Sequence, residues 1–451
     1  MAKCFAYFIG FLLIPFSSIG KVWVPSIFSS GMILQRNENV KIWGKSSPRS
    51  LIVLRPSWTN ETHTYSDDQG CWNIRVKTDN SRDVKHLSIC DDSSKIEINN
   101  ILFGEVWLCS GQSNMAWEIV HKFKSGHKVS CNDATKMTSS SKKHLISYFT
   151  VPKRSENKPI QGIDGEWIKA TPKTTENCSA VAYSFAEKLS EQLNVPIGIV
   201  ISAVGGSKIE AWLNKENNNK IGFNPKIRTN SVHYNSMIYP IKGYGIKGVI
   251  YYQGESNRHR PERYEVSFPM LIHQWRSDWN KELPFFYAQI APYHYKDGHS
   301  YMIRDIQRRV AEKVSNTGVA ILMDLGDENN VHPKTKRPVG HRLANIALHE
   351  TYGKRLNVMS PIIKKVKAKG GKVEITFNKN IILKRSNEFM ISGDNEHFYN
   401  ANVYQKEDNK LIIDCENVKI PSIIRYAFKN WCIAELYGTD GLPVSSFEIK
   451  L

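Results

Sequence analysis

A serine that directly follows a hydrophobic run is the residue of this chain best placed to act as a nucleophile. Residues 105–109 have the composition of a buried strand, and Gly111 interrupts them just before Gln112, Ser113 and Asn114. α/β enzymes present nucleophilic hydroxyls in this way, because a sharp turn after the strand leaves the side chain at a crevice beside free backbone N–H groups. The alternative is a serine that only caps the next helix.

Three further hydrophobic runs end in loops rich in polar residues or glycine. Ligands of an open parallel sheet bind outside the carboxyl ends of its strands. We therefore expect these loops to meet the serine loop in space, although they are far apart along the chain. The runs at residues 197–203, 246–252 and 318–324 are followed by Gly205-Gly206-Ser207, by Gln253-Gly254-Glu255-Ser256-Asn257 and by Asp327-Glu328-Asn329-Asn330-Val331-His332-Pro333, respectively.

The side chains of these loops are complementary for ester hydrolysis. A serine nucleophile needs a base to accept its proton, and His332 is the candidate. The tetrahedral intermediate needs N–H donors, which the backbone amides of Ser113 and Gly206 and the side chain of Gln253 can supply. Each residue also has an ordinary explanation, such as a strand-to-helix turn at the glycines, a polar strand end at Gln253, or a Glu255 that is exposed or pairs with an arginine such as Arg276.

The pattern of hydrophobic residues divides the chain into three regions. Residues 21–103 carry short alternating strands separated by turns, which predicts a β-sandwich. In residues 104–355 strands alternate with helices, the clearest at 179–193 and 338–350, and this predicts a largely parallel sheet between helices. Short strands return in residues 356–451, where we expect a second small β-rich region. The fold class is therefore α/β with flanking β-rich regions.

Composition and charge exclude several classes of function. The chain has 451 residues, of which 41% are hydrophobic and 23% charged, so a packed protein of two or three domains is expected. The net charge of +18 is scattered, which indicates a solvated basic surface and leaves open an attraction for acidic glycans. No basic stripe alternates with aromatic residues, so nucleic acid is not an expected partner. Without a CxxC pair or HExxH segment, neither a metal site nor a cofactor is expected.

The beginning of the chain has the features of a secretory signal peptide. A charged tip precedes an apolar run at residues 4–16, and small residues follow, so residues 1–20 are predicted to be removed. A signal anchor is the alternative. Two sequons, at Asn60 and Asn177, agree with secretion, and no later run is long enough to span a membrane. A secreted or lysosomal location is expected.

Seven cysteines remain after the predicted signal peptide, so at least one must be unpaired or form an intermolecular bond. Cys109 lies in the predicted buried strand and is expected to be the free one. Sequence alone does not fix the connectivity of the others. Their proximity along the chain suggests the pairs Cys71–Cys90 and Cys415–Cys432, which leaves Cys131 and Cys178 as the third pair.

Several segments together resemble the sialate O-acetylesterase family of SGNH-type hydrolases. The similarity extends from about residue 24 to the C-terminus, so it covers nearly the whole mature chain. The segments are Gly111-Gln112-Ser113-Asn114-Met115, Tyr252-Gln253-Gly254-Glu255-Ser256, His332-Pro333-Lys334 with Val339-Gly340 and Arg342-Leu343, the opening Met32-Ile33-Leu34-Gln35-Arg36, and the lead-in Val106-Trp107-Leu108-Cys109.

This resemblance implies a flavodoxin-like SGNH hydrolase domain with a parallel sheet, flanked by N-terminal and C-terminal β-rich, sandwich-like regions. It implies removal of O-acetyl groups from sialic acids through an acyl-serine intermediate, with Ser113 as nucleophile and His332 as general base. Gly206 and Gln253 match the oxyanion positions of the family. Two alternatives remain: an acetylesterase for other acetylated polysaccharides, and a catalytically degenerate glycan-binding protein.

One departure from the wider class concerns the acidic member of a catalytic triad. Asn329 and Asn330 stand where an aspartate is common, three or two residues before the histidine. An amide carries no charge to stabilise an imidazolium, although it or a backbone carbonyl can orient the ring. We favour a Ser–His dyad with backbone help and retain Asp327 as a possible third member. Asp324 is expected to end its strand and not to reach the histidine.

Overall fold

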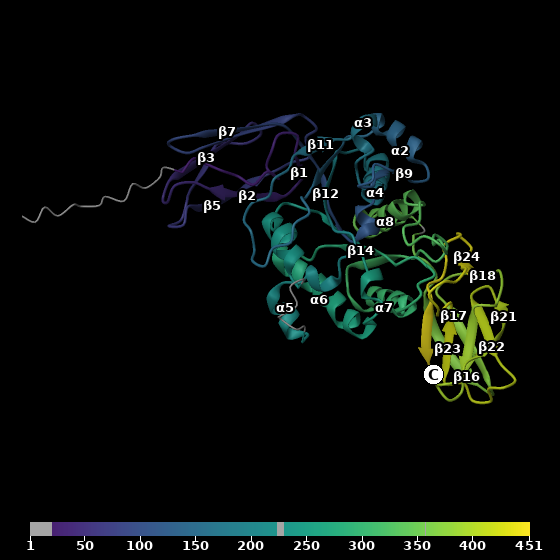
Figure 1. The fold of residues 1–451 in the computed structure, drawn as a ribbon. Helices are drawn as coiled ribbons and strands as arrows, with labels where there is room; N and C mark the ends of the chain where they lie inside the picture. Colours follow the sequence, from purple (N-terminus) through teal and green to yellow (C-terminus); the bar gives the residue numbers. More distant parts are fainter. Residues whose placement is uncertain (1–19, 223–229, 357) are drawn as a thin grey trace, which may run out of the picture.

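The computed structural model describes residues 20–222, 230–356 and 358–451 (Figure 1). Apart from Gly20, the predicted signal peptide lies outside these residues. Figure 1 shows an N-terminal β-rich region and a C-terminal β-rich region on opposite sides of a central α/β domain. Among the helices of the described residues, none is both long and apolar enough to cross a membrane.

A mostly parallel sheet forms the centre of the molecule, as the α/β prediction requires. Its strand order is β11-β10-β12-β7-β13-β14-β15, and each neighbouring pair is parallel except β10 with β11. The inner strands β12, β13 and β14 and the last part of β7 are buried, as expected for a parallel sheet covered on both faces. Their bounds are β7 Lys95–Gly111, β10 Ile146–Thr150, β11 Trp167–Lys169, β12 Ile197–Ala203, β13 Gly248–Tyr252, β14 Phe285–Ala288 and β15 Thr317–Ala320.

Helices cover both faces of this sheet. Successive strand residues point to opposite sides, so the apolar side chains of each strand form a core on either face. Val106 and Leu108 of β7 pack in one core with helices α6 (Pro261–Trp279) and α7 (Ser300–Lys313). Trp107 lies on the other face, in a second core with α4 (Ala180–Leu193) and α8 (Arg337–Glu350). The two helices predicted most clearly from the sequence, α4 and α8, therefore share one face of the sheet.

The N-terminal β-rich region is joined to the central sheet through a shared strand. The first part of β7 pairs with β6, whereas its last residues pair with β12 and β13. The expected domain limit near residue 104 thus falls inside one continuous strand. The remaining strands are β1 Ile33–Gln35, β2 Asn39–Lys45, β3 Leu51–Pro56, β4 Thr62–Tyr65, β5 Cys71–Lys77 and β6 Lys85–Cys90.

The C-terminal region contains two four-stranded sheets, β16-β17-β22-β21 and β20-β19-β23-β25, and a short pair, β18 with β24. Their inward residues form a third hydrophobic core, so this region is β-rich as predicted. The strands are β16 Ile363–Lys369, β17 Lys372–Phe377, β18 Ile381–Leu383, β19 Phe389–Ser392, β20 Tyr399–Asn400, β21 Asn402–Glu407, β22 Lys410–Asp414, β23 Ile423–Tyr426, β24 Leu436–Gly438 and β25 Phe447–Lys450.

Short elements occupy the connections of the central domain, and several lie beside the carboxyl ends of its strands. They are α1 Ser113–Ala116, β8 Val120–Lys122, β9 Lys128–Ser130, α2 Ala134–Ser140, η1 Ser141–Lys143, α3 Pro172–Thr175, η2 Ile209–Ala211, α5 Lys215–Lys220, η3 Tyr234–Ile238, η4 Tyr239–Ile241 and η5 Glu255–Asn257.

The three suggested disulfides are not formed, since all seven cysteines of the described residues are free thiols. Cys71 and Cys90 lie on strands of different sheets, β5 and β6, and the Cys90 sulfur accepts a hydrogen bond from Arg55. The Cys131 thiol donates to the Glu118 carbonyl and that of Cys432 to the Ala427 carbonyl. Proximity along the chain was therefore a wrong guide to pairing. Cys109 is buried and free, as predicted.

Close packing of α4 against α8 depends on Gly340. A Cβ at this position would lie 2.5 Å from the Val181 carbonyl oxygen and 2.6 Å from the Ser184 Cβ. Gly340→Val should therefore destabilise the protein by about 3 kcal/mol, because backbone cannot yield to an added side chain. Urea unfolding measures this change. Glu350→Ala, at an exposed position of the same helix, should stay within about 0.5 kcal/mol of the native chain; equal losses in both variants would contradict the packing argument.

Candidate active site

The structure brings Ser113 and His332 into direct contact. Ser113 is the first residue of α1, immediately after β7, and His332 lies in the loop between β15 and α8. The His332 Nε2 atom is 2.8 Å from the Ser113 Oγ atom, although 219 residues separate the two. The meeting of distant loops at the carboxyl end of the sheet, which the sequence predicted, is therefore observed.

The turn that presents Ser113 requires glycine at position 111. Gly111 has a φ of +136°, and a Cβ there would lie 2.1 Å from the Tyr252 carbonyl oxygen. The next amide, that of Gln112, donates a 2.9 Å hydrogen bond to the same carbonyl. The chain thus leaves β7 pressed against the end of β13 and turns at once into α1, which holds the serine hydroxyl toward the loops.

The glycine pair after β12 lies beside the serine. The Val204 amide donates to the Gly111 carbonyl at 3.1 Å, and a Cβ on Gly205 would come 3.6 Å from the Ser113 Cβ. Gly206 has a φ of +71°, and its N–H donates to no acceptor among the described residues. The Ser113 amide, at the first position of a helix, has no acceptor within that helix. Two backbone donors are thus available near the hydroxyl.

The Gln253 side chain holds the loop that follows β12. It is fully buried, and its Nε2 donates to the Ser207 carbonyl at 3.2 Å and to Asn257 Oδ1 at 2.7 Å. Asn257 in turn donates to Glu210 at 3.0 Å. Both amide hydrogens of Gln253 are therefore engaged. These bonds hold the loop that carries Gly206. Neither amide hydrogen is free for the third oxyanion contact that the sequence predicted.

A buried polar network, which the sequence reasoning missed, fixes the histidine loop to the serine loop. Asn114 Nδ2 donates to Glu255 at 2.6 Å and to the Val331 carbonyl at 3.1 Å, and Lys336 Nζ donates to Asn114 Oδ1. Both charged groups are buried, which raises the pKa of Glu255 and lowers the pKa of Lys336 to about 8. Glu255 thus serves this network and not an ion pair with Arg276, whose partner is Glu282 at 3.5 Å.

The environment of His332 favours its neutral form. Burial is the largest cause, and the charges of Lys336 and His121 add to it; together they lower the pKa of His332 to about 4. The Trp117 ring stacks on the imidazole with a centroid distance of 4.7 Å. Neutral imidazole accepts protons, so His332 is able to act as a base at any pH well above 4.

The acidic candidates lie away from the imidazole. The Asp327 carboxylate accepts a 3.0 Å hydrogen bond from the Asn329 amide within its own turn, and Asp324 pairs with Arg342 at 2.6 Å. Within residues 20–222, 230–356 and 358–451, no carboxylate lies within ion-pair distance of the His332 ring. The arrangement is a Ser–His dyad, and the structure does not bring Asp327 to it.

No metal cluster accompanies the dyad. Across the described part of the chain, no group of three or more His, Cys, Asp or Glu residues is placed to hold a metal ion. The chemistry that this site supports with its own groups is attack by an activated hydroxyl on an ester carbonyl beside two backbone N–H donors.

Comparisons with known proteins relate the chain to carbohydrate esterases. The sequence model of the family described as carbohydrate esterase, sialic acid-specific acetylesterase, matches residues 103–349. Sialate O-acetylesterase of Homo sapiens is 29% identical over 464 residues, which cover 90% of this chain and 87% of that protein. The enzyme of the same name from Rattus norvegicus is 27% identical and covers 79% of both chains.

Among solved structures, a carbohydrate acetylesterase from Xanthomonas citri is similar over almost the whole length. Its sequence is 30% identical, its TM-score is 0.86, and the similarity covers 95% of this chain and 99% of that one. The resemblance therefore includes the flanking β-rich regions as well as the sheet that carries the dyad, and it confirms the predicted fold class.

Proposed function

The chain belongs to the sialic acid-specific acetylesterase family of carbohydrate esterases, and from this membership we propose that it hydrolyses O-acetyl esters of sialic acids through an acyl-serine intermediate. The observation that carries the mechanism is the 2.8 Å contact between Ser113 Oγ and His332 Nε2. The relatives named sialate O-acetylesterase supply the substrate class.

The proposed reaction has two steps. His332 Nε2 accepts the Ser113 proton as Oγ attacks the acetyl carbonyl carbon, and the backbone N–H groups of Ser113 and Gly206 stabilise the oxyanion. The imidazolium then gives its proton to the sugar oxygen, which leaves as an alcohol, and the acetyl group stays on Ser113. Water, deprotonated by His332, attacks the acetyl carbon. Acetate leaves, and the proton returns to Ser113 Oγ.

The low pKa of His332 fits a secreted or lysosomal enzyme, which is the location we propose. A base with a pKa of about 4 remains neutral in an acidic compartment, whereas an ordinary histidine would be largely protonated there. The predicted signal peptide and the exposed sequon residues Asn60 and Asn177 support passage through the secretory pathway.

Lys336→Met is expected to shift the acid limb of the activity–pH profile to higher pH. Removing this cation makes the imidazolium less unfavourable, so the pKa of His332 should rise from about 4 toward its ordinary value, and stay below it because burial remains. The pH dependence of kcat/KM for a small acetyl ester measures the shift. Lys334→Met, at an exposed neighbouring position, is the matched control and should leave the limb in place. An unchanged limb in Lys336→Met would contradict the electrostatic role.

A second candidate substrate is acetylated polysaccharide, which the name of the Xanthomonas citri carbohydrate acetylesterase favours. Acetate release from acetylated sialosides and from acetylated xylan separates the two. We expect kcat/KM to be at least about tenfold higher on the sialosides, a difference of about 1.4 kcal/mol in transition-state binding. A higher kcat/KM on acetylated xylan would show that polysaccharide is the substrate. If acetate were released from neither substrate, the esterase assignment would be wrong.

A further inference from the structure

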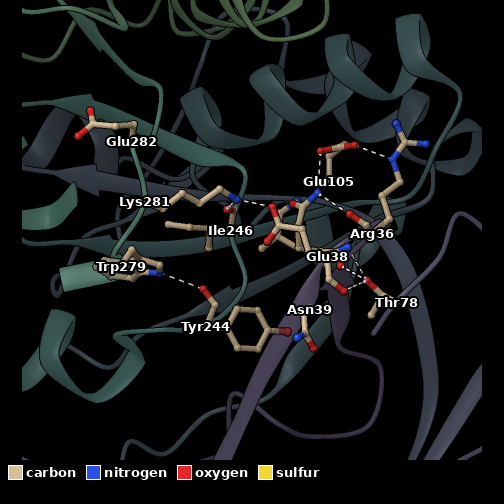
Figure 2. Close-up of polar contacts among 12 residues, drawn as sticks. Arg36, Glu38, Asn39, Thr78, Glu105, Tyr244, Ile246, Trp279, Lys281 and Glu282 are labelled. Carbon is tan, nitrogen blue, oxygen red and sulfur yellow. Dashed lines mark hydrogen bonds and ion pairs between the residues drawn. The ribbon is translucent and has the colours of Figure 1, made fainter. Parts of the chain in front are cut away.

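A cavity of about 580 Å³ lies between the N-terminal β-rich region and the central domain, apart from the dyad. One wall is formed by the paired strands β2 and β5, and the other by residues 239–246 and 278–281. Figure 2 shows part of this junction, where Lys281 reaches toward Glu38 and Trp279 toward Tyr244. None of the four loops that converge on Ser113 contributes to its lining. The volume is that of ordinary small-ligand sites.

Aromatic rings line this cavity, and contacts within the protein hold two of them, Trp43 and Trp279, in place. The Trp43 ring packs edge-on against Phe28 with a centroid distance of 4.6 Å, and the Trp279 N–H donates to the Tyr244 carbonyl at 2.9 Å. Trp23 and Tyr239, which are 39% and 37% exposed, also line it. Fixed, partly exposed aromatic faces present apolar area at little entropic cost. They suit a ligand with flat apolar faces, such as the C–H faces of sugar rings.

The cavity also carries more cations than acids. The charged lining residues are Lys41, Lys45, Arg75, Lys242 and Lys281, together with Glu38, Asp67 and Asp278. Each acid is already engaged. Glu38 pairs with Lys281, and Asp278 pairs with Lys242 at 2.8 Å. Asp67 accepts the backbone N–H groups of its own turn.

Three of these cations therefore have no carboxylate partner among the described residues: Lys41, Lys45 and Arg75. Arg75 donates to the Asn39 carbonyl at 2.8 Å, and the Lys41 ammonium lies 5.9 Å from the centre of the Trp43 ring. Burial, with the nearby charges of Arg75 and Lys242, lowers the pKa of Lys41. An anion bound here would relieve the repulsion between Lys41 and its neighbours Arg75 and Lys242. It would also accept charge-assisted hydrogen bonds from these side chains.

We propose that this cavity is a second glycan-binding site, which takes an acidic oligosaccharide with its carboxylate at Lys41 and Arg75 and its sugar rings against Trp43 and Trp279. A neutral glycan would leave the cations uncompensated, and an anion without apolar faces would leave the aromatic rings unused. The proposal goes beyond ester hydrolysis and does not depend on it, because the cavity requires no acetyl group and no residue of the dyad.

Titration with 3′-sialyllactose, an acidic trisaccharide without acetyl groups, tests the site on the full chain, with lactose as the neutral comparison. We expect sialyllactose to bind at least about tenfold more tightly than lactose and to protect peptides of β2 and β5 from hydrogen exchange. Lys41→Gln with Arg75→Gln should weaken binding at least about tenfold, whereas Lys77→Gln, an exposed position of β5 outside the cavity, should not change it.

Three outcomes would overturn the proposal: equal affinity for lactose, unchanged binding by the double variant, or protection confined to the loops around Ser113. The protection map of the native chain tests the position of the site even if the double variant folds poorly. Hydrolysis of a small acetyl ester by the double variant should equal that of the native chain. Since binding is measured without any ester, a failed esterase assignment and a failed binding site give different results.

Discussion

Ser113→Ala should abolish acetate release from an acetylated sialic acid, with a loss in kcat of at least about 10⁴-fold. The variant removes the Oγ atom that lies 2.8 Å from His332 Nε2, so no acyl intermediate is able to form. Alanine is a good helix former, and the position begins a helix, so the fold should be retained. Acetate release at saturating substrate measures the loss, and circular dichroism checks the fold.

Ser256→Ala is the matched control, because this serine lies in the neighbouring loop but makes no contact with His332 among the described residues. Its activity should stay within about twofold of the native chain, the range of substitutions away from key contacts. Full activity in Ser113→Ala would refute the assignment of Ser113 as the nucleophile. A native chain that binds glycans but releases no acetate would support the degenerate binding protein instead.

The second large effect is expected for His332→Ala, which should also lower kcat by at least about 10⁴-fold. Without the imidazole, the Ser113 hydroxyl has no acceptor for its proton and the leaving sugar oxygen has no donor. Asp327→Asn discriminates between dyad and triad in the same assay. Because the Asp327 carboxylate bonds the Asn329 amide and not the ring, the dyad predicts a loss below about tenfold, whereas a triad acid predicts a loss near 10⁴-fold.

The contact between Ser113 and His332 was predictable from the sequence, because strand ends of a parallel sheet converge whatever lies between them. The same logic placed Gly206 and Gln253 near the serine. It could not show which way an amide points, so the Gln253 bonds to Ser207 and Asn257 appear only in the structure. Nothing in the local pattern marks Lys336 as buried either, because lysine is ordinarily exposed and its partner Asn114 is 222 residues away.

The limits of the sequence reasoning on the fold have similar causes. The hydrophobic run 105–109 is only the end of the long strand β7, whose first part alternates between exposed and buried residues and pairs with β6. β15 ends at Ala320 and not at residue 324, since its pairing with β14 stops at Ala288 and Ala320. The disulfide suggestions were wrong because spacing along the chain does not determine which thiols come within bonding distance in space.

Fluorophosphonate labelling followed by peptide mapping tests most directly whether Ser113 is an activated nucleophile. The reagent reacts with serine hydroxyls that a base has activated, and leaves ordinary capping serines unmodified. The native chain should carry one adduct, on the peptide that contains Ser113, and His332→Ala should label far more slowly. An unlabelled native chain, or an adduct on another serine, would contradict the Ser113–His332 dyad.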